Sequence, residues 1–404
     1  MGKNLNRENR DSIVSQRILG FPRNVFFLGL VSLFMDISSE MIHPLIPLFL
    51  SETLHVSKTF IGIIEGIAES TASMLKVFSG WFSDRIGRRK PIIFWGYCIS
   101  VVSRPILATA SSWIHVLIYR FTDRIGKGVR TAPRDAIIAD SSDRSILGKA
   151  FGFHRSMDTI GAVIGPSMAF LLLGIFHNRV QSVFWFSMIP GLFALISIIL
   201  FVREVRPRCK MEKAVITIRG LDRRFKIFLL ISALFTLGKT TEAFLVLRAN
   251  EIGISIATIP LLYLTFNIVS ATLSTPAGLL ADRVGKRKTI MTSYIFLSLL
   301  FIGFATARTP LHAWSLFVGY GIFVAMNEGI QRAFVATLIR PEIKATGYGI
   351  YHTTVGLAAL PSGIISGILW QNIGSYALFY FGTVTSFVSF VLFAMFLFKP
   401  NKPA

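Results

Sequence analysis

Residues 80–90 read GWFSDRIGRRK, a short charged turn between two apolar segments, and this turn decides the fold. The pattern recurs at 278–288 as GLLADRVGKRK, 198 residues later at every position. One copy would be a charged loop and little more. Two copies at matching places between apolar segments indicate that the chain consists of two homologous halves.

The composition is that of a membrane protein. Of the 404 residues, 52% are hydrophobic and only 16% are charged, whereas about 25% of the residues of a soluble chain are charged. Apolar runs of about 20 residues can cross a hydrocarbon layer of about 30 Å, and segments of this length cross it as helices. We count twelve such spans: 24–50, 57–83, 91–110, 113–139, 148–173, 182–202, 225–249, 256–281, 288–307, 312–339, 346–370 and 375–398.

The basic residues are distributed unevenly between the two sets of loops. If the N-terminus is cytoplasmic, the cytoplasmic loops hold 28 of the 42 Lys and Arg residues and the opposite loops hold four. The positive-inside rule therefore predicts that both termini are cytoplasmic, and it accounts for the net charge of +21 without nucleic acid. The predicted organisation is a tail, a six-helix bundle, a basic cytoplasmic linker, a second six-helix bundle and a short tail: 1–23, 24–202, 203–224, 225–398 and 399–404.

The fifth and eleventh spans carry a second repeated element, in which two or three glycines precede a proline. It comprises Gly152, Gly161, Gly165 and Pro166 in the fifth span, and Gly347, Gly356 and Pro361 in the eleventh. Glycine and proline allow a helix to bend. We therefore predict helix bends at Gly161, Gly165, Pro166 and Pro361.

With these features the chain resembles the major facilitator superfamily of transporters over essentially its full length. The turn matches that family's signature between helices 2 and 3 at Gly80, Asp84, Arg85, Gly87 and Arg88, and the second copy supplies Asp282, Arg283 and Gly285. Arg120 matches the family's helix-4 arginine in R-x-x-Q-G-x-G, although Asp123 and Arg124 replace the Gln and the first Gly.

The resemblance implies an all-α membrane protein with two pseudo-symmetric six-helix bundles and a central cavity lined mainly by helices 1, 4, 7 and 10. It also implies alternating access by rocking of the two halves. By the same analogy, the turn is expected to close a cytoplasmic gate through Asp84 and Arg85. The alternative is that the basic residues of the turn only set the topology.

The fourth span carries a stripe of charge. Its five basic and two acidic residues fall within an arc of about 140° on a helix: Arg120, Asp123, Arg124, Lys127, Arg130, Arg134 and Asp135. A charge inside the bilayer costs roughly 3 kcal/mol, so the stripe is expected to face the protein interior.

Two interpretations of this stripe remain open. In the first, Arg120, Arg124, Lys127 and Arg130 bind an anionic substrate together with Lys239 of the seventh span, because arginine suits carboxylate and phosphate. In the second, the stripe is neutralised by ion pairs, since the spans contain ten bases and nine acids.

Proton coupling requires a carboxylate near the cavity that can change its protonation. The candidates for this role, or for a permanent charge pair, are Asp36, Glu40, Glu69, Asp123 and Glu328. Asp36 and Glu40 lie one helical turn apart on the same face, and Asp36 is expected near the middle of the membrane.

The sequence thus predicts a monomeric secondary active transporter of the cell inner membrane. It would move a small organic anion, and its transport would be coupled to protons by symport or antiport. The lipid bilayer is the other expected partner, and no binding to nucleic acid is expected. The alternatives are a proton-coupled multidrug exporter, favoured by the fifth-span glycines and 36 phenylalanines, and a non-transporting receptor. No catalytic constellation, metal-ligand spacing or nucleotide-binding loop is present, so we predict no enzyme activity, no cofactor and no metal.

Overall fold

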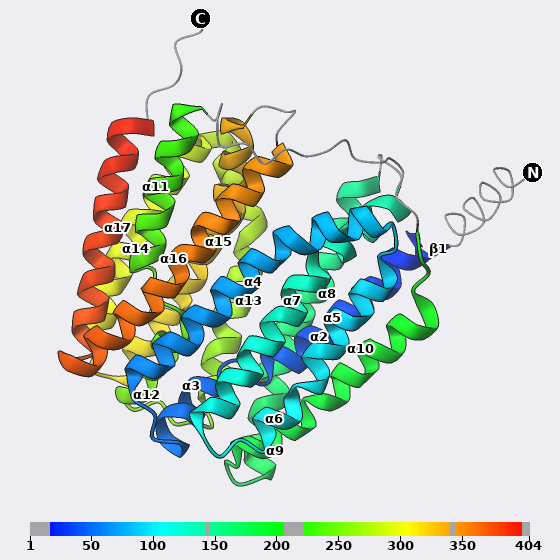
Figure 1. Cartoon of the computed structure of the whole chain (residues 1–404). Helices are drawn as coiled ribbons and strands as arrows, with labels where there is room; N and C mark the ends of the chain where they lie inside the picture. The colour runs from blue at the N-terminus through cyan, green and yellow to red at the C-terminus, as the bar shows by residue number, and fades with distance from the viewer. Residues whose placement is uncertain (1–16, 143–145, 206–221, 340–343, 398–404) are drawn as a thin grey trace, which may run out of the picture. The chain divides into compact units, whose positions relative to one another are not determined.

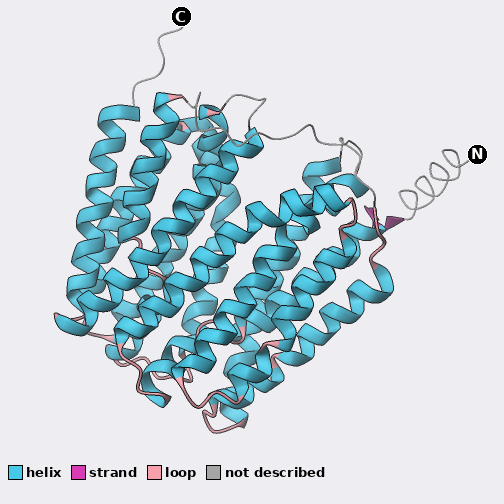
Figure 2. Ribbon diagram, in the orientation of Figure 1, coloured by secondary structure: helices cyan, strands magenta, loops and turns pink. Residues whose placement is uncertain are grey.

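The computed structural model describes residues 17–142, 146–205, 222–339 and 344–397 (Figure 1). Nearly all of them are helical (Figure 2), in agreement with the predicted all-α class. One small hairpin pairs β1 (Arg17–Ile18) with β2 (Phe21–Pro22). The last predicted tail, 399–404, lies outside the described residues, as do most of the first tail and of the linker.

The chain divides into two compact units, Met1–His43 with Met74–Lys213 and Pro44–Ser73 with Ala214–Ala404. The first unit contains α2 (Arg23–Glu40), α5 (Lys90–Val102), α6 (Arg104–Ala108), α7 (Trp113–Ser141), α8 (Leu147–Ile175), α9 (Val180–Phe186) and α10 (Met188–Phe201). The second contains α3 (Ile46–Leu48), η1 (Phe49–Thr53), α11 (Arg223–Gly238), α12 (Glu242–Glu251), α13 (Ile259–Val284), α14 (Lys286–Thr306), α15 (Pro310–Leu338), α16 (Lys344–Asn372) and α17 (Ser375–Leu397). Helix α4 (Lys58–Ile86) contributes its residues through Ser73 to the second unit and the rest to the first.

Among the described residues, eight helical segments are long and apolar enough to cross a membrane. They are Lys90–Ala108, Leu147–Ile175, Val180–Phe201, Arg223–Glu251, Ile259–Val284, Lys286–Thr306, Gly347–Asn372 and Ser375–Leu397. The other four predicted spans are helical too, in α2, α4, α7 and α15. Charged side chains are most frequent in α7, as the stripe described above requires.

Several spans that the sequence predicts as single helices are broken. The span 91–110 has an irregular turn at Ser103, between α5 and α6, and the span 182–202 has one at Ser187, between α9 and α10, although both serines keep helical backbone angles. The span 225–249 is interrupted at 239–241, between α11 and α12. A continuous apolar run does not reveal such breaks, because hydropathy does not depend on backbone conformation.

The two units use the same scheme of helix pairing. In the first unit α2 packs against α8 and α10, and α5 packs against α7 and α10. In the second unit α11 packs against α16 and α17, and α14 packs against α15 and α17. Because each helix of one unit has its counterpart at the same place in the sequence repeat, the repeat extends from the motifs to the packing.

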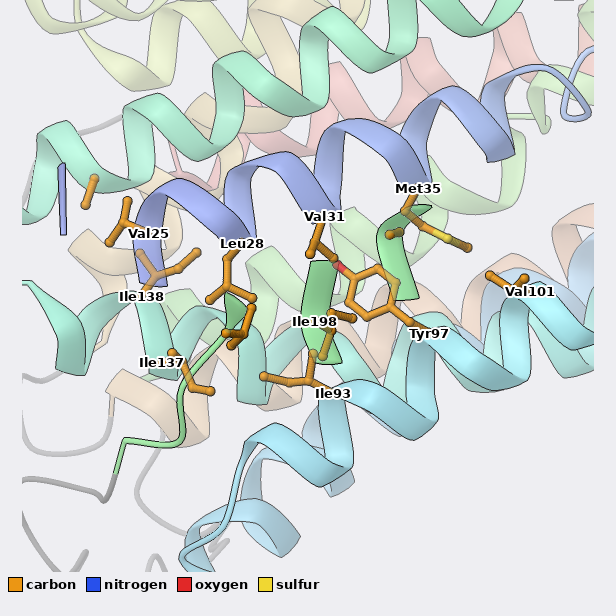
Figure 3. Packing of buried hydrophobic residues seen from close by; sticks show 13 residues of the cluster. Val25, Leu28, Val31, Met35, Ile93, Tyr97, Val101, Ile137, Ile138 and Ile198 are labelled. Carbon is orange, nitrogen blue, oxygen red and sulfur yellow. The ribbon is translucent and has the colours of Figure 1, made fainter. Parts of the chain in front are cut away.

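The core of the first unit is built on one face of α2 (Figure 3). Val25, Leu28, Val31 and Met35 recur at intervals of three or four residues, which places them on one side of a helix. They pack with buried residues of α5, α7 and α10: Ile93, Tyr97, Val101, Ile137, Ile138, Ala194 and Ile198. Ser32, Asp36 and Glu40 lie on an adjacent side of α2, about 100° round the helix from this apolar row.

In the second unit, glycines bring α4 and α16 into close contact. A Cβ atom added to Gly66 would lie 2.8 Å from the carbonyl oxygen of Leu360, and Gly62 similarly faces Gly363. The Ser70 hydroxyl donates a hydrogen bond to the carbonyl of Gly356 one turn further along. Small residues four apart allow this approach between membrane helices, where packing replaces the hydrophobic effect as the driving force.

Arg104 joins three helix ends in the first unit. Its guanidinium is fully buried and donates from Nη1 to the Ser38 carbonyl (2.6 Å) and the Ser187 hydroxyl (3.1 Å). Nη2 donates to the Ser39 hydroxyl (3.3 Å). Ser38 and Ser39 belong to the last turn of α2, and Ser187 lies at the break between α9 and α10. One charged group therefore satisfies backbone and hydroxyl oxygens that the broken helices would otherwise bury without partners.

We predict that Arg104→Met lowers the free energy of unfolding by an amount on the order of 3 kcal/mol, because several charge-assisted hydrogen bonds are lost and buried acceptors remain. Thermal unfolding of the purified protein in detergent measures the change. Arg179→Met, at an exposed turn position before α9, is the matched control and should have little effect. Equal losses in both variants would contradict the assignment.

Candidate functional site

The charged stripe of α7 is mostly buried within the first unit. Arg120, Asp123, Arg124 and Arg130 retain 2%, 7%, 5% and 6% of their accessible surface, whereas Lys127 is exposed. The stripe is therefore not a solvated face, and each of its buried members needs partners in the protein.

Close contact between α5 and α7 fixes Arg130. A Cβ atom added to Gly96 would lie 2.9 Å from the Gly126 carbonyl, so the two helices approach each other at backbone distance. Arg130 Nη1 donates to the Ser100 hydroxyl at 2.6 Å, and its guanidinium lies 4.5 Å from the centre of the Tyr97 ring. The structure thus places this predicted substrate ligand against α5.

Arg124 contacts a histidine that the sequence analysis did not select. Its Nη2 atom lies 3.0 Å from Nε2 of His43, in the turn between α2 and α3. Since a guanidinium can only donate, His43 Nε2 accepts the hydrogen bond and the imidazole is neutral in this arrangement. The only signal in the sequence was a His-Pro pair inside the predicted first span.

The two carboxylates of α2 lie beside the glycines of α8. A Cβ atom added to Gly161 would be 2.8 Å from the Cβ of Asp36, and one added to Gly165 would be 2.8 Å from the Cβ of Glu40. Both pairs are spaced four residues apart, so two successive turns of α2 and α8 are in register. Gly161 and Gly165, which we predicted as bend positions, are thus the residues of α8 that pack against Asp36 and Glu40.

Bends were also predicted at Pro166 and Pro361. Helix α8 is continuous through Pro166, and α16 is continuous through Pro361.

The remaining predicted coupling and substrate residues belong to the second unit. Lys239 lies at the break between α11 and α12, with its Nζ atom 5.7 Å from the centre of the Phe323 ring. Glu328 is 3.8 Å from Arg332 of the same helix, and Glu69 is half-buried on α4. The structure therefore brings Asp36, Glu40, Asp123, Arg120, Arg124 and Arg130 together in one unit, and Lys239, Glu328 and Glu69 in the other.

The break in the seventh span leaves polar groups of the second unit without hydrogen bonds inside a helix. The hydroxyls of Thr240 and Thr241 are buried and have no hydrogen-bond partner among the described residues. Next to them, Glu242 accepts a hydrogen bond from the hydroxyl of Tyr263 at 2.5 Å. In membrane transporters, interrupted helices with free polar groups are typical of solute sites. The sequence analysis selected Lys239 here but missed the break.

Both copies of the repeated turn contain a glycine in the left-handed region. The φ angles are +67° at Gly87 and +103° at Gly285, which L residues rarely adopt. Arg85 and Arg88 are exposed, as is Arg283, while Asp282 lies 3.6 Å from Lys286. Gly80 faces Ala132 of α7. The side chain of Asp84 lies outside the described residues.

Two contacts of the first turn were not predicted. Arg89 is buried and forms an ion pair with Asp140 at the end of α7. The Glu204 carboxylate accepts hydrogen bonds from the backbone N–H groups of Arg89 and Lys90, both at 2.9 Å. It thereby caps the N-terminus of α5, where a negative charge is favourable. Glu204, near the start of the predicted linker 203–224, is therefore hydrogen-bonded to the turn at residues 80–90.

No cluster of three or more His, Cys, Asp or Glu side chains suitable for a metal ion occurs in the part of the chain that the structure describes.

Comparisons with known proteins agree on one family. The family model of the Major Facilitator Superfamily matches residues 28–238 and 227–404. An uncharacterised MFS-type transporter of Methanocaldococcus jannaschii is 35% identical over 378 residues, which cover 92% of this chain and 94% of the relative. The solved structure of the nucleoside transporter NupG is similar with a TM-score of 0.77 and 16% identity, covering 93% of this chain and 99% of that one.

Two further relatives have names that state a function. The multidrug resistance protein MdtL of Shigella dysenteriae is 27% identical over 303 residues, which cover 72% of this chain and 73% of the relative. Citrate exporter 1 of Aspergillus niger is 26% identical over 193 residues, covering 45% of this chain and 34% of the relative.

We predict that Gly161→Ala lowers the free energy of unfolding by roughly 1–3 kcal/mol, because the added methyl group overlaps the backbone of α2 at Leu33 and the stem of Asp36. Gly152→Ala on the same helix is the matched control, since a Cβ atom there meets nothing within 4 Å. It should be neutral or stabilise by up to about 1 kcal/mol through helix propensity. The check is thermal unfolding of both variants, and a smaller loss for the first variant than for the control would contradict the packing.

Proposed function

Since the chain belongs to the major facilitator superfamily, we propose that it is a secondary active transporter for a small organic anion, coupled to protons and working by alternating access. Family members are transporters and not enzymes. We further propose twelve spans in two six-helix bundles with the predicted boundaries. The shared helix pairing of the two units supports this arrangement.

The observation that carries the anionic substrate is the contact between Arg124 and neutral His43. Arg120, Asp123 and Arg124 lie buried on the same part of α7, with two positive charges and one negative charge. A site with excess positive charge in a low dielectric attracts an anion strongly, and a guanidinium fits a carboxylate by two hydrogen bonds. We therefore place the substrate carboxylate at Arg124 and His43, with Arg120 and Lys127 in support.

Arg130 and Lys239 are given different roles in this proposal. Arg130 is held by Ser100 and Tyr97, so it keeps α5 and α7 in place and contributes charge at a distance. Lys239 lies beside the hydroxyls of Thr240 and Thr241, which have no hydrogen-bond partner among the described residues, and we propose that Lys239 also contributes to anion binding. Polycarboxylates such as citrate are the proposed substrate class, and the resemblance to a citrate exporter supports this class.

Asp36 and Glu40 are the proposed proton-coupling residues. Their backbone positions on α2 are fixed against Gly161 and Gly165 of α8, so a shift between these helices changes the surroundings of both carboxylates together. A carboxylate that moves between two environments binds a proton in one of them and releases it in the other. Asp123, Glu69 and Glu328 are proposed to act as charge partners.

The proposed setting is the inner membrane, with both termini cytoplasmic and the chain acting as a monomer. The repeated turns then lie on the cytoplasmic side, where 28 basic residues gather. We propose that Asp84 and Arg85 take part in a gate at this side, and that the Arg89–Asp140 ion pair and the Glu204 cap hold the turn in shape.

A proton-coupled multidrug exporter is the second candidate, and the similarity to MdtL favours it. The two candidates differ in the substrate that we propose for each, an organic anion for the first and a lipophilic cation for the second. A buried guanidinium next to histidine disfavours a cation unless a carboxylate intervenes.

A thermal-shift screen of the purified protein distinguishes the two candidates. A ligand at about 100 times its dissociation constant stabilises the folded state by roughly 2.7 kcal/mol. We expect citrate to raise the unfolding temperature of the wild type, and Arg124→Gln to abolish this shift. Arg308→Gln, an exposed arginine, is the control and should retain it. Stabilisation by tetraphenylphosphonium and by no anion would reject the anionic substrate.

We predict that Asp36→Asn abolishes the dependence of transport on a pH gradient, because an amide side chain does not change its protonation near neutral pH. Citrate exchange at equal pH should persist. The measurement is citrate accumulation in proteoliposomes with and without the gradient. Accumulation that still follows the gradient would remove Asp36 from the coupling mechanism.

A further inference from the structure

A second polar cluster lies in the first unit, separate from the residues assigned to substrate. It is formed where α2, α7 and α8 meet. Its members are His154 and Asp158 of α8, Ser32 of α2, and Arg134 and Asp135 of α7. None of its hydrogen bonds or ion pairs involves Arg124 or His43, so the mechanism proposed above leaves it without a role.

The contacts of Asp158 connect all three helices. One carboxylate oxygen accepts a hydrogen bond from the Ser32 hydroxyl, and the other lies 3.6 Å from Nδ1 of His154. The Ser32 oxygen in turn accepts a hydrogen bond from Nη1 of Arg134 at 3.3 Å. Arg155, the next residue on α8, is exposed, and His154 is the side chain of α8 that lies beside Asp158.

His154 has one nitrogen without a partner. The residue is 4% exposed, and its Nε2 atom is buried with no hydrogen-bond partner among the residues that the structure describes. A neutral imidazole with its proton on Nδ1 leaves a lone pair on Nε2, which tolerates burial far better than an N–H group. This conformation therefore suits the deprotonated histidine.

Protonation of Nε2 changes that balance. It places a positive charge next to Asp158, which is favourable, but it also creates a buried N–H donor with no acceptor. A shift of α8 relative to its neighbours is one way for this donor to gain an acceptor or water. A ligand that binds one conformation better than another shifts the population toward it, and the proton is such a ligand here.

We propose that His154 and Asp158 form a proton-binding pair that couples proton uptake to a movement of α8 against α2 and α7. This inference rests on the proposed proton-coupled transport and adds a second proton site to Asp36.

The surroundings of the pair contain charges of both signs. On α7 they are Arg134 and Asp135, and on α8 Arg155 is the neighbour of His154. On α2, Asp36 lies one turn beyond Ser32 and interacts electrostatically with Asp158. Because Asp36 and Asp158 have the same charge, a proton on one of them makes ionisation of the other easier, which links the pair to the proposed coupling residue.

The direct test is nuclear magnetic resonance of the full chain in lipid nanodiscs with labelled histidine. The chain has seven histidines, and the signal missing in His154→Gln identifies His154. We expect this signal to titrate between about pH 3 and 7, and Asp158→Asn to lower its midpoint by at least about half a pH unit, because the negative charge beside the imidazolium is lost. A signal that does not change over this range, or that titrates identically in Asp158→Asn, would overturn the proposal. Asp158→Glu, which keeps the charge, serves if Asp158→Asn does not fold.

Transport supplies the second readout, with citrate as the probe. We expect His154→Gln to reduce accumulation driven by a pH gradient by at least about fivefold, while exchange at equal pH stays within about twofold of the wild type. His177→Gln, an exposed residue in the turn after α8, is the control and should behave as wild type. Gradient-driven accumulation that persists in His154→Gln contradicts the proposal. If the wild type moves no citrate, the proposed anionic substrate is rejected. The titration experiment alone then tests whether His154 and Asp158 bind a proton.

Discussion

The interaction on which the structure most depends is the pairing of buried charge inside apolar helices. Arg120, Asp123, Arg124 and Arg130 are almost fully buried on α7, and Arg104 is fully buried on α6. Charges in such surroundings are stable only when neighbouring groups satisfy them. For Arg104 these groups lie at the end of α2 and at Ser187, and for Arg124 the partner is His43 in the turn after α2. Arg130 instead contacts Ser100 within α5.

Glycine makes this pairing possible, because it lets polar helices approach each other at backbone distance. Gly96 and Gly126 bring α5 to α7, and Gly161 and Gly165 bring α8 to the two carboxylates of α2. A helix contact without side chains between the backbones sets where the neighbouring charges lie in this conformation. The same helices carry the proposed substrate site and the proposed proton sites, and in our proposal the substrate and the proton act on one set of contacts.

Much of this arrangement could be predicted from the sequence, but its details could not. The repeated turn, the apolar runs and the stripe on α7 follow from periodicity, which sequence shows directly. The break at 239–241, the His43–Arg124 contact and the Glu204 cap on α5 join residues that are far apart or locally inconspicuous. Arg130 shows the limit most clearly: its charge and position predicted an interior location, but only the structure shows that it contacts Ser100.

The most direct test of the central claim is a simultaneous record of citrate and proton flux in proteoliposomes that contain the purified chain. The account predicts that citrate entry is accompanied by a pH change in the lumen, and that a pH gradient alone drives citrate accumulation. Citrate movement without any proton movement would contradict the coupling. Proton movement driven by a lipophilic cation, with no citrate flux, would contradict the anionic substrate and favour the exporter.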